Sequence, residues 1–237
     1  MSPKPRSNEH DQIDERLGLM DELLVVHEGA DSAETVERVV DFSRSVIGCD
    51  DAGVLLVHTR RRIETAAATS SAVARAHDLQ VELDEGPCLD ALENPGAIYT
   101  VDDLSTDPRW PKWSAEVLRL GFRSVVSVPL ATTERRYGSL NVYSTRPHAF
   151  DDDDIAVTMV VARHASVALG AARDIEGLRR AIDARKLIGM AMGMLMERYG
   201  IDSDQAFDVL RRYSQHHNVK LRDVALQVVE QRGLPAE

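Results

Sequence analysis

The sequence contains little cysteine and no long apolar run. Its two cysteines, Cys49 and Cys88, belong to no C-x-x-C pair, which excludes a disulfide framework and argues against a structural zinc site. No run of about eighteen apolar residues is available to span a bilayer. The opening residues MSPKPRSNEHDQ also lack the apolar segment of a signal peptide. We therefore expect a cytoplasmic protein that does not contact a membrane.

Sequence motifs of catalysis are also missing. There is no glycine-rich phosphate loop, no G-x-S-x-G elbow and no paired metal-ligand motif. The acidic run from Asp151 to Asp154 lacks the order of a calcium-binding loop and fits a helix start, where the backbone dipole favours negative charge. We expect no enzyme activity, no catalytic residue and no metal site, and the sequence leaves any cofactor unknown.

Basic residues are in the minority, and the net charge is −11. Such a charge argues against a nucleic-acid partner, because phosphate binding requires Lys and Arg. The charge is uneven, however, since the chain from Arg173 onward holds 11 Lys and Arg against 10 Asp and Glu. The C-terminal part is thus the least acidic, which permits RNA binding there.

The length of 237 residues and the apolar content of 43% allow two domains with separate cores. Residues 1–31 are predicted to form a polar tail and a short amphipathic helix. A helix capped by Ser32 then carries an apolar face from Val36 to Ile47. Apolar runs predict strands at 52–58, 63–69, 97–101, 123–130 and 138–145, separated by helices at 71–80, 88–93 and 112–120. Together they favour an α+β fold, an antiparallel sheet flanked by helices.

Four segments in this region resemble a GAF domain. They are DEGPCLDAL at 84–92, DLSTDPRWPKW at 103–113, GFRSVVSVPL at 121–130 and GSLNVYS at 138–144, within a predicted domain of residues 32–170. The resemblance implies a sensor domain, from a family that binds cyclic nucleotides, tetrapyrroles, other small molecules or no ligand.

The GAF-like motifs supply four candidate ligand-binding residues, which are Cys88, Asp103, Trp110 and Trp113. Two alternatives remain open. The tryptophans can simply cover the sheet, and Cys88 can be a buried structural cysteine, because neighbouring carboxylates disfavour a reactive thiolate.

A long helix is predicted after residue 151. Its apolar positions repeat with gaps of three and four residues, as in a heptad seam: Val161, His164, Ala168, Ala171, Ile175, Leu178 and Ile182. One interpretation is a parallel coiled coil, with residues 171–184 as a linker helix that joins two copies into a homodimer. The other is a single helix that packs back on the sheet.

The last part of the chain is predicted to form three helices. The first has apolar residues from Leu187 to Leu195, including Met190 and Met194. The second is capped by Asp202 or Ser203 and buries Ala206, Phe207 and Leu210. The third runs from Leu221 to Gly233. Gly189 and Gly193 lie inside the first helix, where each costs about 1 kcal/mol relative to Ala. We expect that a neighbouring helix approaches closely at these two glycines, or alternatively that an RNA backbone does.

This stretch resembles the ANTAR domain, the RNA-binding output domain of bacterial antitermination regulators. The resemblance rests on R-x-L-I-G-x-A-x-G-M-L-M-E-R-Y-G-I-x-x-x-x-A-F-x-x-L-R-R, from Arg185 to Arg212, and on N-x-K-L-R-D-V-A, from Asn218 to Ala225. It implies a three-helix RNA-binding module over residues 185–232.

Polar residues at the junction of the second and third helices are the main candidates for RNA contact, because hairpin loops offer phosphates, base edges and base faces. Tyr213 could stack on a base or belong to the core, and the cations could be a solvated helix end. The adjacent His216 and His217 are expected to be solvated surface in a polar turn. The RNA-binding candidates are Arg185, Lys186, Arg211, Arg212, Tyr213, Gln215, Asn218, Lys220 and Arg222.

The sequence as a whole predicts a cytoplasmic, dimeric regulator. Its GAF-like domain would sense a ligand or partner, and its ANTAR-like domain would bind hairpins in nascent mRNA and promote antitermination. Two other functions remain open, a protein-interaction scaffold without RNA binding and a DNA-binding regulator.

Overall fold

The computed structural model describes residues 31–58, 62–94 and 96–233. The predicted tail and short helix in residues 1–30 lie outside this part. The chain divides into two compact units, Met1–Arg173 and Asp174–Glu237, and helix α6 (Asp152–Tyr199) contributes residues to both.

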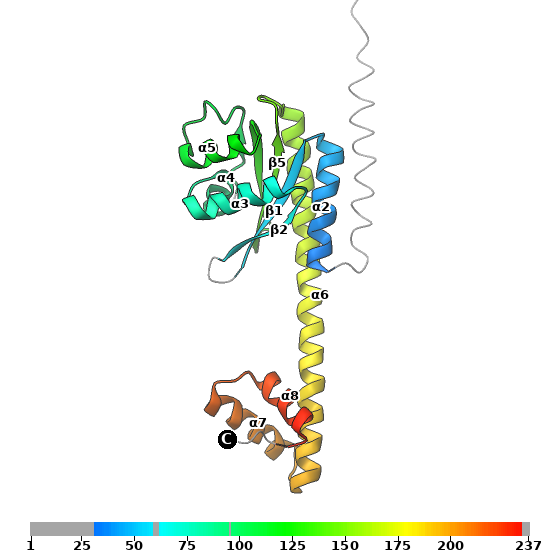
Figure 1. Ribbon diagram of the computed structural model, residues 1–237. Helices are drawn as coiled ribbons and strands as arrows, with labels where there is room; N and C mark the ends of the chain where they lie inside the picture. The colour runs from blue at the N-terminus through cyan, green and yellow to red at the C-terminus, as the bar shows by residue number, and fades with distance from the viewer. Residues whose placement is uncertain (1–30, 59–61, 95, 234–237) are drawn as a thin grey trace, which may run out of the picture. The chain divides into compact units, whose positions relative to one another are not determined.

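The first unit is an α+β domain, as predicted (Figure 1). Its five strands form one antiparallel sheet in the order β2-β1-β5-β4-β3. In chain order its elements are α2 (Ser32–Ile47), β1 (Asp51–Val57), β2 (Ile63–Ala68), α3 (Ser71–Leu83), α4 (Pro87–Glu93), β3 (Tyr99–Val101), α5 (Pro111–Arg119), β4 (Ser124–Ala131), β5 (Arg136–Ser144) and the first part of α6.

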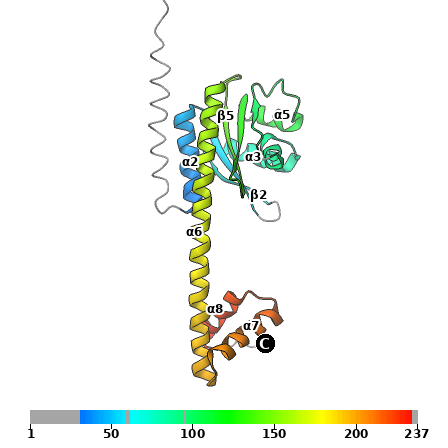
Figure 2. The ribbon, with the colours of Figure 1, turned by 180° about the vertical axis from the view of Figure 1, so that it is seen from behind.

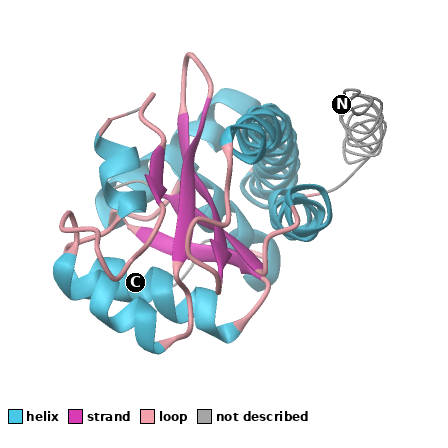
Figure 3. Ribbon diagram, turned by 90° about the horizontal axis from the view of Figure 1, so that it is seen from above, coloured by secondary structure: helices cyan, strands magenta, loops and turns pink. Residues whose placement is uncertain are grey.

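Helices cover both faces of the sheet, with α2 and α6 on one side and α3, α4 and α5 on the other (Figures 2 and 3). Successive strand residues point to opposite faces. On β5, Leu140 and Val142 therefore join the core under α2 and α6, while Tyr143 joins the second core with Trp113 and Val125. Every residue of β5 after Arg136 is buried as a result.

Two helix starts in this unit are set by aspartates. The N-cap of α2 is Asp31, which accepts a hydrogen bond from Glu34 N at 2.9 Å. The prediction of Ser32 was wrong by one residue, because Ser32 is already helical. The acidic run at α6 acts as predicted, since Asp151 Oδ1 accepts from Asp154 N at 2.9 Å, where the helix dipole favours a carboxylate.

The predicted heptad seam of α6 is divided. Val161 and Ala168 are buried, with Val161 packed in the core of the sheet, so at these positions the helix packs on its own domain. Ile175, Leu178 and Ile182 are 44%, 65% and 63% exposed. The 3.6-residue period lets one helix carry a sheet-facing stripe and a separate exposed stripe, so the first part of the predicted seam fits packing on the sheet and the later part stays exposed.

Helix α6 is also the one helix in the described ranges that is long and apolar enough, by length and composition alone, to cross a membrane. In its most apolar stretch of 18 residues, 44% of the residues are buried. Ala162, Ala165 and Leu169 pack in the core against the sheet.

The second unit has the predicted three-helix core, from the end of α6, α7 (Ser203–His217) and α8 (Leu221–Gln231). Asp202 caps α7 in a capping box with Gln205, which decides between the two predicted caps. The apolar core of this unit consists of Ala191, Leu195, Ala206, Leu210, Val224, Ala225 and Val228.

Three details of this unit differ from the prediction. Met190 and Phe207, expected in the core, are 47% and 38% exposed, because Ala191 and Leu195 form the centre of the buried stripe and α7 turns Ala206 and Leu210 inward. Gly189 and Gly193 have no described atom within 4 Å of an added Cβ. The close approach predicted at these glycines is therefore absent within the described chain.

We expect Gly138→Ala to disrupt the first unit. A Cβ at Gly138 would lie 1.7 Å from the carbonyl oxygen of Leu55 on the neighbouring strand β1. The clash involves backbone on both sides, so the loss of stability should be on the order of 4 kcal/mol or more, measured by thermal unfolding with circular dichroism. Gly177→Ala is the matched control, because it meets no described atom and should stabilise its helix by about 1 kcal/mol. Similar unfolding temperatures for the two variants would contradict this.

Candidate functional site

The first unit contains a cluster of buried polar side chains on the sheet face that α3 and α4 cover. His77 and Gln80 come from α3, Cys88 from α4, and Ser127 and Asn141 from β4 and β5, where they are direct cross-strand partners. All five are 0% exposed. We call this group the polar cluster.

Hydrogen bonds join the polar cluster into one network. The Cys88 thiol and the Ser127 hydroxyl both donate to Asn141 Oδ1, at 2.8 Å and 2.7 Å. Gln80 makes two hydrogen bonds to Cys88: its Nε2 donates to the sulfur and its Oε1 accepts from the Cys88 backbone N, both at 2.8 Å. Asn141 Nδ2 lies 3.2 Å from His77 Nε2.

Burial keeps this network uncharged. Desolvation lowers the pKa of His77 to about 3, so its imidazole is neutral near pH 7. Since Asn141 Nδ2 can only donate, His77 Nε2 accepts and Nδ1 carries the proton, which points to Thr65 Oγ1 at 3.3 Å. Desolvation also raises the pKa of Cys88 to about 11, against hydrogen bonds from Gln80, Ser139 and Ser127 that lower it. Cys88 is therefore a thiol, the unreactive form.

Tyr143 adjoins the polar cluster and has an unpaired hydroxyl. Its side chain is 0% exposed, its ring centroid lies 6.1 Å from that of His77, and its hydroxyl has no hydrogen-bond partner among the described residues. Burial and the nearby Cys88 raise its pKa well above the ordinary value. A buried hydroxyl without a partner costs roughly 1–3 kcal/mol, so a partner for this hydroxyl would stabilise the folded domain.

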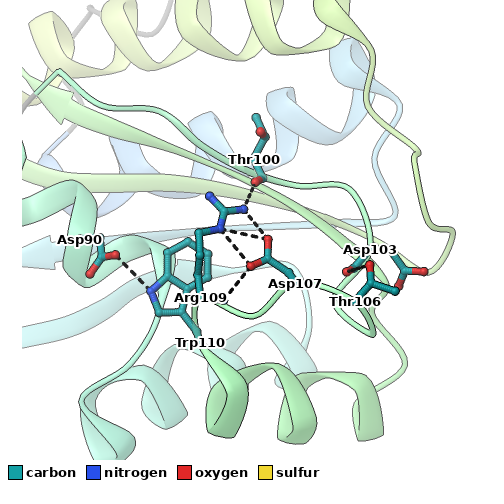
Figure 4. Close-up of polar contacts among 7 residues, drawn as sticks. All are labelled: Asp90, Thr100, Asp103, Thr106, Asp107, Arg109 and Trp110. Carbon is teal, nitrogen blue, oxygen red and sulfur yellow. Dashed lines mark hydrogen bonds and ion pairs between the residues drawn. The ribbon is translucent and has the colours of Figure 1, made fainter.

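Of the four predicted ligand residues, the structure places only Cys88 in the polar cluster. Trp113 is fully buried and its Nε1 donates to Ala76 O at 2.9 Å. Trp110 donates to Asp90 Oδ2 at 3.1 Å (Figure 4), and its ring packs edge-on against Trp113 at 6.2 Å. These contacts fit the alternative in which the tryptophans cover the sheet.

Asp103 has a different setting. Its carboxylate pairs with Arg123 at 2.9 Å and accepts from Ser105 N at 3.0 Å. The hydrogen bond from Arg123 holds the pKa of Asp103 well below its usual range. Nearby, Arg109 pairs with Asp107, donates to Thr100 O and stacks over the Trp110 ring at 4.6 Å (Figure 4). Both ion pairs tie down the loop between β3 and α5.

Most of the polar cluster was not predicted from the sequence. In β4 and β5, polar residues alternate with apolar ones at Ser127, Ser139 and Asn141, a pattern that normally marks a solvent-facing side. Here helices cover that side, so the polar residues are buried. A polar face on strands flanked by helical segments was the signal that could have identified them.

In the second unit, the basic candidates flank the turn between α7 and α8. Arg211, Arg212 and Gln215 are exposed on α7, and Arg222 is exposed in the first turn of α8. Lys220 is exposed at the N-cap of α8 without a side-chain capping bond. The dipole at a helix start favours an anion. A phosphate near Lys220 and Arg222 would therefore be attracted both by their charges and by the start of α8.

The turn itself is held by defined hydrogen bonds. Asn218 ends α7 in the left-handed conformation at φ 52°. Val219 N donates to Ser214 O at 3.1 Å, and Ser214 Oγ donates to Val219 O at 2.6 Å. Arg211 is partly neutralised by Asp208 at 2.8 Å, while Arg185 and Lys186 are exposed on α6.

Tyr213 is half-buried and packs against the three-helix core. His216 and His217 were predicted in a turn but belong to the last turn of α7. They are exposed, as predicted. The described residues contain no group of three or more His, Cys, Asp or Glu side chains placed to hold a metal ion.

Solved structures similar to this chain have the fold of the first unit. The GAF domain of cyanobacteriochrome TePixJ is 20% identical, with a TM-score of 0.52, over 62% of this chain and 94% of its own. Free methionine-R-sulfoxide reductase from Neisseria meningitidis is 21% identical, with a TM-score of 0.53, over 66% of this chain and 89% of its own.

A GAF domain from Acinetobacter phosphoenolpyruvate-protein phosphotransferase is 15% identical, with a TM-score of 0.52, over 75% of this chain and 99% of its own. At these identities the likeness concerns the fold alone. No curated protein matches the chain.

Two domain families match the sequence directly. The GAF domain matches residues 29–170, more than half of the chain, and the ANTAR domain matches residues 176–229. A GAF domain is a sensor domain and an ANTAR domain is an RNA-binding antitermination module, and both are regulatory rather than catalytic. The chain therefore belongs to the GAF domain family and, with its ANTAR domain, is a GAF-ANTAR regulator.

Proposed function

We propose that this chain binds hairpins in nascent mRNA through its ANTAR domain and promotes transcription antitermination, under the control of its GAF domain, in the cytoplasm. The observation that carries the proposal is the set of exposed cations on both sides of the α7–α8 turn, Arg211, Arg212, Lys220 and Arg222. They lie in a domain that belongs to an RNA-binding family, on a chain whose net charge is otherwise acidic.

The physical basis of this binding is phosphate contact. Lys and Arg side chains displace condensed counterions from the RNA, which makes affinity fall as salt rises. Lys220 and Arg222 lie at the start of α8, where the helix dipole adds to their attraction for phosphate. Asn218 and Gln215 offer amide groups to base edges, and Arg185 and Lys186 supply a further basic pair on α6.

For the sensor, we propose that the GAF domain receives a small molecule at the polar cluster. A neutral network of donors and acceptors suits an uncharged polar ligand, and the unpaired Tyr143 hydroxyl is a further group for it. Cys88 lies in this network. Asp103 and Trp110 belong to the loop between β3 and α5, and Trp113 belongs to α5; they remain ligand candidates outside the polar cluster.

We also propose that two copies of the chain pair through α6. Ile175, Leu178 and Ile182 are large apolar side chains exposed in the second unit, and their spacing of three and four residues places them on one face of the helix. A second copy would remove this stripe from water, with about 25 cal/mol gained per Å² of apolar surface buried.

Lys220→Ala should weaken binding to a tandem-hairpin RNA at every sequence tested. Because one phosphate contact is lost, the slope of log affinity against log salt should become shallower by about one. Fluorescence anisotropy at several salt concentrations measures both quantities. Arg44→Ala removes an exposed cation from α2 of the GAF domain and should leave both unchanged. If the two variants have the same affinity and the same salt slope, the assigned site is wrong. If the wild-type protein binds no RNA, the alternative of a protein-interaction scaffold without RNA binding is favoured.

Leu178→Asp should convert a dimer to a monomer without unfolding the chain, since Leu178 is 65% exposed and a charge there costs little in one copy. Sedimentation velocity measures the change in mass. The control is Arg179→Asp, an exposed neighbour outside the apolar stripe, which should leave the dimer intact. A dimer that persists in the Leu178 variant contradicts pairing through this stripe.

Tyr143→Phe should leave the thermal stability of the GAF domain unchanged or raise it by about 1 kcal/mol, because the hydroxyl it removes has no described partner. Ser127→Ala should lower stability by a similar amount, since it removes a donor to Asn141. Differential scanning calorimetry compares the two. A marked loss in the Tyr143 variant would show that its hydroxyl is bonded in solution, and native mass spectrometry would then test for a co-purifying small molecule.

A further inference from the structure

Three aromatic rings gather at the C-terminal end of α7. The ring centroids of Tyr213 and His217 lie 4.2 Å apart at an interplanar angle of 31°, and those of His217 and His216 lie 4.9 Å apart at 86°. Tyr213 is half-buried, and both histidines are exposed. We call these three residues the aromatic ladder.

The aromatic ladder is anchored at one end. Tyr213 packs against the three-helix core, and residues four apart on a helix lie on one face, so its ring supports that of His217. The two histidines stand nearly at right angles and leave ring surface open to solvent. Ordered, exposed aromatic surface of this kind provides contact area at little cost in conformational entropy.

The ladder also lies directly beside the basic residues in the chain. Only Asn218 and Val219 separate His217 from Lys220. The hydrogen bonds between Ser214 and Val219 fix this short connection. The structure thus holds a stacking surface and a cation in a set order, which is the preorganisation that favours tight binding.

We propose that the aromatic ladder is a base-stacking site, on which His217 and His216 receive an unpaired base of the hairpin loop while Lys220 contacts the backbone beside it. This inference rests on the proposed RNA binding and adds residues that the sequence pattern did not assign. Flat aromatic rings bind the faces of unstacked bases, which loops and single strands expose. Duplex grooves present base edges instead, so the ladder selects the loop rather than the stem.

Stacking and phosphate contact leave different signatures, which makes the site testable. A stacked base contributes affinity that is largely independent of counterions, whereas a phosphate contact sets the salt slope. His217→Ala should therefore weaken binding to a hairpin RNA roughly five- to a hundredfold, with the same salt slope as the wild type. His217→Phe should restore affinity at both pH 6 and pH 8, because the ring and not its charge is used.

The direct readout is a tandem-hairpin RNA with 2-aminopurine at each loop position in turn, titrated with the full-length protein. Wild-type protein should change the fluorescence at one loop position, and this change should disappear with His217→Ala. The control Arg44→Ala removes an exposed side chain from α2 of the GAF domain and should leave the signal unaltered. Circular dichroism confirms that each variant is folded.

The outcomes separate this inference from the function it rests on. If wild-type protein binds with a normal salt slope, but His217→Ala and His216→Ala bind equally well, the base-stacking site is wrong and RNA binding stands. If the wild type binds no hairpin at all, the proposed function fails and the stacking site fails with it. Loss of affinity together with a shallower salt slope would assign His217 to phosphate contact and overturn the stacking role.

Discussion

The coverage of both faces of the sheet is the constraint on which the first unit depends. The α2 and α6 helices close one face with an apolar core, and α3, α4 and α5 close the other. Because the second face is also sealed, Ser127, Asn141 and His77 lose their contact with water. They must bond to one another, since an unpaired buried polar group is costly. The polar cluster is thus a direct consequence of the layer arrangement.

The buried polar cluster also bears on how the GAF domain could respond to a ligand. Replacing both partners of a buried hydrogen bond by apolar groups of the same shape is close to neutral or stabilising. The chain instead keeps Gln80, Cys88 and Asn141 in one bonded set, next to a Tyr143 hydroxyl that has no described partner. A network of this kind changes its bonding pattern when one member finds a new partner. This supports the proposed sensing role of the domain.

In the second unit, local hydrogen bonds at the helix ends accompany a buried core. The core that joins α6, α7 and α8 is small, and the Asp202 cap and the left-handed Asn218 determine where α7 begins and ends. Because α7 ends at Asn218, His217 is the last residue of a helix and Lys220 opens the next one. The proposed RNA surface consists of these helix ends, which are the parts of a helical module with free polar groups.

The strands, the three C-terminal helices and both families could be predicted from the sequence, because period-two and 3.6-residue patterns and ordered motifs are local properties. Which apolar stripe of α6 meets the sheet depends on tertiary structure, since Val161 and Ile175 look alike in sequence but differ in burial. Tertiary packing also buries the polar side of β5. These outcomes depend on what lies opposite each residue, and a one-dimensional pattern does not specify that partner.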